Sequence, residues 1–290
     1  MPRGYATTRL GQVHFESSGE GPPLVLLPAS KRSSRMFATL IPHLAPKLRA
    51  IAPDLPGFGN SDPLPPGTSI ETLAGCVLDL LDQLGIAKAN VYGLHTGNKI
   101  GAALAVMAPA RVDRLILAGQ THSLIPDQTA RNSAIEELVS KQFAQTYIDT
   151  ARAPRASELT RWADLFRRIT SRWWDRAVIE SDLGTAERAH VIRVILDDLQ
   201  SFDSNVHLYQ ANFAYDLGRD FRRISVPTLV LEIVTPHEDQ WLGRQGTVVQ
   251  GLIPDAMLAR LEEPSGDGIT LEHRAADLAR IILDFVGPSR

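Results

Sequence analysis

The sequence predicts an α/β fold, in which a mostly parallel, twisted sheet is flanked by helices and interrupted by an inserted helical block. Short apolar segments alternate with helical segments over residues 1–122 and 224–290. Such alternation gives a parallel sheet connected by right-handed crossovers. Between residues 123 and 223, helical patterns follow one another without a clear strand. We therefore expect a core formed by 1–122 and 224–290 and a helical cap formed by 123–223.

The first elements of the core follow from local patterns. The stretch YATTRLGQVHFESSG (5–19) is typical of a hairpin. The short apolar runs LVLLPA (24–29) and RAIAPD (49–54) are typical of buried parallel strands. Between them, residues 36–48 are predicted to form a helix, although two prolines disturb its pattern.

The rest of the core continues the alternation. Apolar residues at helical spacing predict a helix from Thr72 to Leu84, and Gly85 is expected to end it. Next come a strand at 89–93, a helix at 96–108 and a strand at 111–119. After the cap, the expected order is a strand at 227–234, a helix through Leu252, the segment 256–263 and a final helix at 271–286.

Composition excludes several classes of partner. The net charge of −3 gives no reason to expect nucleic acid or an anionic membrane as a partner. No apolar window is long enough to span a bilayer, and the N-terminus, MPRGYATTRL, lacks the apolar core of a signal peptide. The single cysteine, Cys76, excludes an internal disulfide and is expected to be an inert core thiol. We expect a cytoplasmic protein, either a monomer or a homodimer, that acts on a small molecule.

The sequence GLHTG (93–97) stands between a predicted strand and a predicted helix. A turn this tight brings the backbone close to itself, so Gly93 and Gly97 remove side chains where they would collide. The central residue, His95, is expected to adopt an uncommon backbone conformation and to project above the edge of the sheet. The amide of Thr96 begins a helix, and it is expected to point an N–H and the positive end of a helix dipole into the same space.

Four segments together resemble the α/β-hydrolase superfamily: GLHTG, APDLPGFGNSDP (52–63), LVLLPAS (24–30) and PSGDGITLEH (264–273). Their order and spacing match over nearly the whole chain, and the second segment contains the specific pattern D-x-P-G-x-G-x-S. The resemblance implies the α/β-hydrolase fold. It does not by itself give a function, because this fold supports hydrolases, lyases, dehalogenases, cofactor-free oxygenases and inactive receptors.

The sequence departs from the pattern that the family implies at three places. His95 occupies the position of the nucleophile, where the family has Ser, Asp or Cys. Pro28 and Ala29 replace the family's His-Gly after the third strand, and Ser30 then falls where the second amide of an oxyanion hole is implied. Asp267 occupies the position of the catalytic histidine, in the pattern G-D-x-x-x-x-E before the last helix.

The loop that holds the catalytic acid in the family reads TPHEDQW here, and His237, Glu238 and Asp239 all remain candidates for its counterpart. His122 follows the sixth strand and is a candidate to contact the substrate. His95, His122 and His237 would be a zinc-binding set if they converged. Their spacing is not local, so we expect no metal, and we expect no other cofactor.

In the predicted cap, Trp173 and Trp174 are adjacent and are therefore expected to point in different directions, so at least one of them is expected to face the substrate. The other histidines, His14 among them, are interpreted as surface or helix-end residues.

We expect His95 to act as a general base or as a nucleophile, with Asp267 orienting its ring. A carboxylate beside an imidazole fixes its tautomer, and the amides of Thr96 and Ser30 would stabilise the resulting oxyanion. Such an enzyme hydrolyses or cleaves an ester, a lactone or an activated carbon–carbon bond, and hydrolase and lyase remain alternatives. If His95 only fills the pocket and Asp267 is a turn residue, the protein instead binds a small ligand without catalysis.

Overall fold

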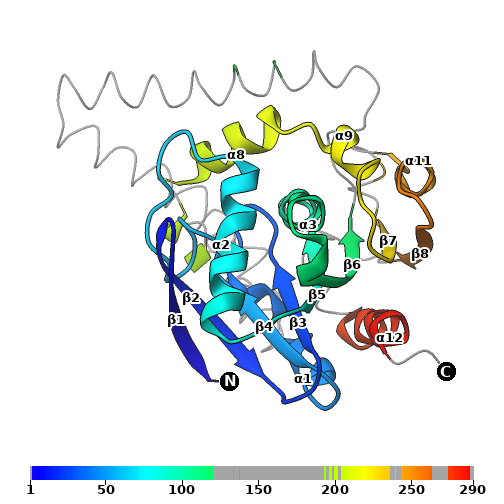
Figure 1. Ribbon diagram of the computed structural model, residues 1–290, viewed down its shortest axis with the longest axis horizontal. Helices are drawn as coiled ribbons and strands as arrows, with labels where there is room; N and C mark the ends of the chain where they lie inside the picture. Colours follow the sequence, from blue (N-terminus) through cyan, green and yellow to red (C-terminus); the bar gives the residue numbers. More distant parts are fainter. Residues whose placement is uncertain are drawn as a thin grey trace, which may run out of the picture.

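The computed structural model describes residues 2–119, 204–235, 243–262 and 274–287, together with positions 133, 137, 193, 196, 197, 199, 200, 201 and 239. Its strands form one eight-stranded sheet in the order β1-β2-β4-β3-β5-β6-β7-β8 (Figure 1). They are β1 (Arg3–Thr8), β2 (Gly11–Ser18), β3 (Pro23–Leu27), β4 (Arg49–Pro53), β5 (Ala89–Leu94), β6 (Val112–Ala118), β7 (Thr228–Val234) and β8 (Met257–Glu262). β1 pairs with β2, and β2 with β4, in antiparallel fashion, whereas the other pairs are parallel. The predicted fold class is confirmed.

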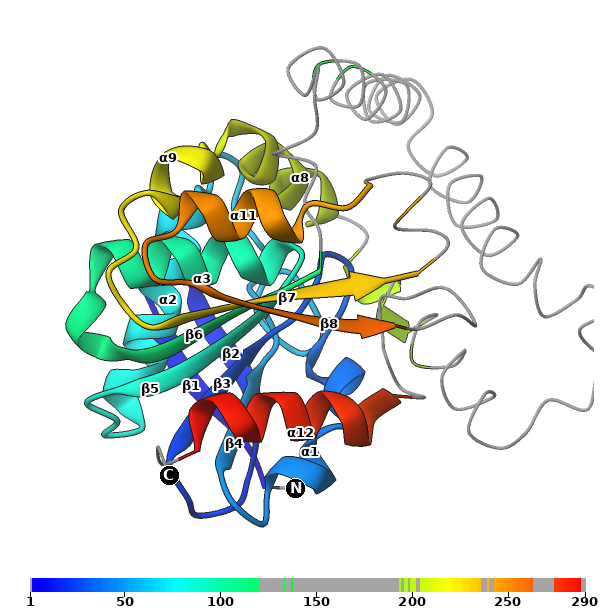
Figure 2. The same ribbon diagram turned by 90° about the vertical axis from the view of Figure 1, so that its right-hand side faces the viewer.

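Helices cover both faces of the sheet (Figure 2). One face packs against α2 (Ile70–Gln83), α3 (Thr96–Met107) and α11 (Gly246–Leu252), and the other against α1 (Ile41–Leu44) and α12 (Ala275–Val286). A buried strand therefore contributes to two hydrophobic clusters. Val25 and Leu27 of β3 belong to the cluster with α2 and α3, whereas Leu24 and Leu26 belong to the cluster with α1 and α12. Burial on both faces explains why these strands have continuous apolar sequences.

The single helix predicted over 36–48 is wrong. The structure has a short 3-10 helix, η1 (Ser34–Phe37), followed by α1, which is only four residues long. Pro42 lies in the first turn of α1, where the N–H that it lacks would have no acceptor within the helix. A continuous helix would instead press the ring of Pro42 against the carbonyl four residues earlier.

Helix α2 begins at Ile70, two residues before the predicted start. The hydroxyl of Ser69 accepts a hydrogen bond from the amide of Thr72 (3.1 Å) and so caps the helix. Gly85 follows the helix with φ +66°, a conformation that favours glycine, as the sequence predicted. Cys76 is buried on this helix, and burial raises the pKa of its thiol.

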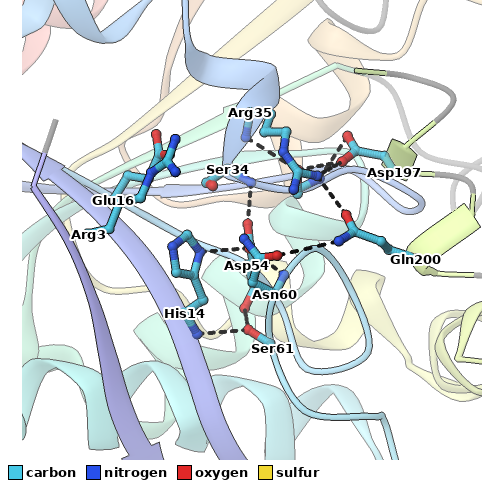
Figure 3. Close-up of polar contacts among 11 residues, drawn as sticks. Arg3, His14, Glu16, Ser34, Arg35, Asp54, Asn60, Ser61, Asp197 and Gln200 are labelled. Atoms are coloured by element: carbon cyan, nitrogen blue, oxygen red, sulfur yellow. Dashed lines mark hydrogen bonds and ion pairs between the residues drawn. The ribbon is translucent and has the colours of Figure 1, made fainter. Parts of the chain in front are cut away.

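His14 is buried in β2, so its interpretation as a surface or helix-end residue is wrong. Its Nδ1 lies 2.8 Å from Oδ2 of Asp54, whose side chain is also buried (Figure 3). The same carboxylate accepts hydrogen bonds from the main-chain amides of Ser34 (2.6 Å) and Asn60 (2.9 Å). Through these hydrogen bonds, Asp54 connects β2 to the loops that follow β3 and β4.

Two helices, α8 (Asn205–Ala214) and α9 (Leu217–Phe221), fall within the range predicted as the cap. They lie on the side of α3 that faces away from the sheet (Figures 1 and 2), and Phe221 is buried in the cluster with α2 and α3. Most of 123–223 is outside the described residues, so the cap and its boundaries stay a prediction. In the part of the chain that is described, no helix is long and apolar enough to cross a membrane.

Candidate active site

His95 forms the junction between β5, which ends at Leu94, and α3, which begins at Thr96. Its backbone has φ 49° and ψ −102°, a combination that residues with a side chain rarely adopt. The amide of His95 donates a hydrogen bond to the carbonyl of Ala118 (3.2 Å), at the end of the neighbouring strand β6. The uncommon backbone conformation expected of the central residue of GLHTG is present.

The two glycines of GLHTG allow backbone segments to approach closely. A Cβ placed on Gly93 would lie 2.3 Å from the carbonyl oxygen of Gly97. A Cβ placed on Gly97 would lie 2.3 Å from the carbonyl oxygen of Leu27, at the end of β3. Since real Cβ atoms do not come this close to backbone, any side chain at either position would displace the turn.

The imidazole of His95 lies against the end of β6. A Cβ on Gly119 would be 3.1 Å from Nε2 of His95 and 3.3 Å from its Cδ2. Gly119 has φ +74° and follows β6 directly. A side chain at position 119 would therefore press against the ring and require it to shift slightly.

The loop that contains Ser30 is also held in an unusual conformation. Lys31, the next residue, has φ 60°. Of the three described non-glycine residues with positive φ, Lys31 and His95 both belong to this site. Asp197 anchors the loop, because its buried carboxylate accepts hydrogen bonds from the hydroxyl (2.5 Å) and the amide (3.2 Å) of Ser33. Figure 3 shows the contact of the same carboxylate with Arg35 (3.0 Å).

Ser30, Thr96 and Asn212 form a polar cluster beside His95. The hydroxyl oxygens of Ser30 and Thr96 are 2.5 Å apart. Nδ2 of Asn212, which α8 contributes, donates to the Thr96 hydroxyl (2.9 Å) and the Ser30 hydroxyl (3.3 Å). The two residues predicted from sequence to flank the oxyanion hole are thus brought together. The orientation of their amides toward a substrate stays a prediction.

Lys99 supports this cluster from inside the protein. It lies one helical turn after His95 on α3, and only 6% of it is exposed. Its Nζ donates a hydrogen bond to the main-chain carbonyl of Asn212 (2.6 Å). Burial lowers the pKa of Lys99 to about 8, because desolvation penalises its charged form.

Replacing Lys99 with methionine is expected to change how stability depends on pH. The pKa of Lys99 is lower in the folded protein than the value of about 10.4 for an unfolded chain. Between about pH 8 and pH 10.4 the unfolded state therefore binds more protons, and the stability of the wild type rises with pH relative to the variant. The free energy of unfolding of the wild type should rise relative to that of the variant by at most about 1.4 kcal/mol per pH unit. Urea unfolding of both proteins at pH 7, 8, 9 and 10 measures this difference.

The matched control is Lys88→Met, since the side chain of Lys88 is half exposed and pairs with Asp113 at the surface. This variant should follow the wild type at every pH. Parallel stability curves for the wild type and Lys99→Met would contradict the depressed pKa of Lys99.

Comparison with known proteins identifies the family. A model of the α/β hydrolase fold family matches residues 22–187. The chain belongs to this family. An uncharacterized hydrolase of Saccharomyces cerevisiae is 38% identical over 108 residues, which are 36% of this chain and 37% of that protein. A soluble epoxide hydrolase of Corynebacterium is 33% identical over 114 residues, which are 39% of this chain and 40% of that protein. The chain thus spans about two fifths of the length of these curated relatives.

The solved structures that resemble this α/β hydrolase agree on the fold. The enol-lactonase of Burkholderia xenovorans superposes with a TM-score of 0.67 at 24% identity, and the match covers 98% of this chain and 100% of that one. The fold of this chain is therefore shared with that enzyme over nearly the whole length of both chains. A sequence identity of 24% shows a shared fold only. The chemistry of this chain has to be argued from the residues of its own site.

The acidic partner predicted for this α/β hydrolase is only partly within the described residues. Asp239 is described: it is exposed, and it forms an ion pair with Arg244 (2.7 Å). Six other predicted site residues lie outside the described part of the chain: His122, Trp173, Trp174, His237, Glu238 and Asp267. Among the described residues, no group of three His, Cys, Asp or Glu could hold a metal ion.

Two residues of the site were missed from sequence. Lys99 is a charged residue in the apolar helix TGNKIGAALAVM, and a lysine four residues after His95 could have indicated a buried polar contact. Asn212 offered no such signal, because its contact with Thr96 joins positions 116 residues apart.

Proposed function

We propose that this α/β hydrolase is a hydrolytic enzyme that cleaves an ester or lactone with His95 as its general base. The observation that supports the proposal is the backbone of His95, with φ 49° at the junction of β5 and α3. Backbone conformations of this kind cost free energy, and they persist where the surrounding structure enforces them, most often at functional sites. The close packing around Gly93 and Gly97 enforces this one.

In the proposed reaction, a water molecule gives a proton to the imidazole of His95 while its oxygen attacks the carbonyl carbon of the substrate. The amides of Thr96 and Ser30 would donate hydrogen bonds to the negative oxygen that develops on the carbonyl. When the tetrahedral intermediate collapses, the carbon–oxygen bond to the leaving group breaks, and the imidazolium returns its proton to that oxygen. Asp267 is the proposed residue that orients the ring. No covalent intermediate is required, which agrees with the absence of Ser, Asp and Cys at position 95.

The names of related proteins support hydrolysis of a small molecule, and one of them names a lactone. One relative is named as a soluble epoxide hydrolase and another as a 2-hydroxymuconate semialdehyde hydrolase, and a structural neighbour is an enol-lactonase. Each name describes hydrolysis of a small oxygen-containing molecule. Cleavage of an activated carbon–carbon bond fits the same base and the same oxyanion donors.

Replacing His95 with alanine is expected to reduce kcat about 10²- to 10⁴-fold, the usual contribution of a general base. The measurement is the hydrolysis of 4-nitrophenyl acetate and of δ-valerolactone by the wild type and the variant. Asp267→Asn should lower kcat in the same assay with the fold intact.

The control is His43→Ala, because His43 is exposed on α1 and its loss should leave turnover unchanged. Equal turnover by the wild type and His95→Ala would exclude His95 as the base. If the wild type hydrolyses neither substrate, the alternative of a ligand-binding protein without catalysis is favoured.

A further inference from the structure

Asn212 connects α8 to both parts of the candidate site. Asn212 is buried, with only 6% of the residue exposed. Its Nδ2 is within hydrogen-bond distance of both hydroxyls of the cluster, that of Thr96 on α3 and that of Ser30 in the loop after β3. A buried amide in this position sets the distance between two chain segments that are 66 residues apart in sequence.

The cluster contains two hydroxyl protons, and only one of them has an acceptor within the cluster. Each hydroxyl supplies one proton and accepts through its lone pairs. Asn212 donates to both hydroxyl oxygens, so it takes up none of their protons. The 2.5 Å contact between Ser30 and Thr96 uses one of the two protons, and the other remains for an acceptor outside the cluster.

Burial indicates which hydroxyl has that remaining proton. Thr96 is only 5% exposed, whereas Ser30 is half-buried. If Thr96 donates to Ser30, the proton of the Ser30 hydroxyl is directed away from Thr96, to the more exposed side of the cluster. The Lys99 ammonium, which donates to the carbonyl of Asn212, holds the main chain of α8 at this residue and places a positive charge behind the cluster.

We infer that the hydroxyl of Ser30 is a substrate-binding donor for a negatively charged oxygen, and that Asn212 is the positioning residue that aims it. The inference rests on the proposed function, because the oxygen concerned is the oxyanion of the reacting carbonyl or the carboxylate of the acid product. Ser30 then provides two donors, its amide and its hydroxyl. Thr96 contributes its hydroxyl to the cluster and its amide to the same oxygen.

Benzoate, an analogue of a carboxylate product, tests this site without turnover. Its binding to the wild type is measured by chemical-shift titration of the ¹⁵N-labelled full chain. Loss of one hydrogen bond to a charged group weakens binding by about 10- to 100-fold, so Ser30→Ala and Asn212→Ala should each raise the Kd of benzoate by that factor. Ser30→Thr keeps the hydroxyl and should retain most of the affinity.

The matched control is Gln210→Ala, an exposed position on the same helix as Asn212, and it should bind benzoate as the wild type does. Thermal unfolding of each variant separates loss of the site from loss of the fold. Benzoate affinity that is unchanged in Ser30→Ala would overturn the role of the hydroxyl, as would a wild type that does not bind benzoate. Unchanged affinity in folded Asn212→Ala would overturn the positioning role.

The benzoate titration and the ester assay give separate answers. If His95→Ala abolishes turnover while Ser30→Ala binds benzoate normally, His95 remains the base and the Ser30 donor is excluded. If the wild type hydrolyses neither test substrate but benzoate binding depends on Ser30 and Asn212, the anion site stands and the proposed hydrolysis fails. In an active enzyme, Asn212→Ala should lower kcat more than it raises KM, because a donor aimed at the oxyanion acts mainly in the transition state.

Discussion

Replacing Asp54 with alanine is expected to lower the free energy of unfolding by about 3–5 kcal/mol, because three hydrogen bonds to its carboxylate are lost. The carboxylate is 1% exposed and accepts hydrogen bonds from His14, Ser34 and Asn60. Without it, the buried donors of His14 and Ser34 lose their acceptor, and a buried donor without an acceptor costs free energy. Urea unfolding at pH 7 measures the difference from the wild type. The control is Asp62→Ala, since Asp62 is exposed and accepts a hydrogen bond from the amide of Gln12. This variant should lose far less free energy of unfolding than Asp54→Ala.

The same variant has an expected pH dependence. Burial by itself would raise the pKa of Asp54, but hydrogen bonds from His14, Asn60 and Ser34 outweigh burial and lower the pKa below its ordinary value. The carboxylate therefore stabilises the fold above the unfolded pKa of about 3.9, and this contribution is lost as the pH falls through the folded pKa. The stability gap between the wild type and Asp54→Ala should narrow below about pH 4. A gap that is constant down to pH 3 would contradict this assignment.

Replacing Gly97 with alanine is expected to destabilise the protein by about 3 kcal/mol or more, at the upper end of the range for overpacking. The new Cβ would meet the carbonyl oxygen of Leu27 at 2.3 Å. The obstacle is backbone in a central strand of the sheet, so it cannot rotate away as a side chain would. Thermal and urea unfolding measure the loss, and the ester assay measures the displacement of His95.

Gly101→Ala is the matched control, because Gly101 lies on the same helix one turn after Gly97. Its Cβ would first meet the terminal methyl of Leu115, at 3.1 Å, which can shift. Alanine is also favoured over glycine in a helix interior by about 1 kcal/mol, so this variant should be close to the wild type in stability. Similar losses in Gly97→Ala and Gly101→Ala would show that the close approach of α3 to β3 is not specific to Gly97.

Much of the core could be predicted from sequence because its signals are local. The buried strands are short apolar runs such as LVLL in β3. Both faces of that strand are covered, so its sequence is apolar throughout and does not alternate between apolar and polar residues. GLHTG predicted a turn with two glycines at close approach, and both are found there. The prediction over 36–48 is wrong because apolar residues continue at helical spacing through Pro42, whose ring is compatible only with the first turn of a helix.

The polar contacts could not be predicted, because they join residues far apart in sequence. His14 and Asp54 meet across the β2–β4 pairing, 40 residues apart, and no local pattern distinguishes a buried histidine from a surface one. Asn212 reaches Thr96 and Ser30 only because α8 packs over α3. Asp267 was inferred as the partner of His95 from the family pattern alone, and it lies outside the described residues, so it stays a prediction.

The close contact between the His95 ring and Gly119 links the residues that positions 95 and 119 can accept. Gly119 has φ +74°, so its own backbone favours glycine whatever stands at position 95. An ancestor with a small nucleophile at position 95 and glycine at 119 could therefore have accepted an imidazole in one step. With a Cβ at position 119, the ring of His95 would have to shift by a few tenths of an ångström to relieve the contact. The glycine that the backbone favours at position 119 thus also leaves room for a large side chain at the turn.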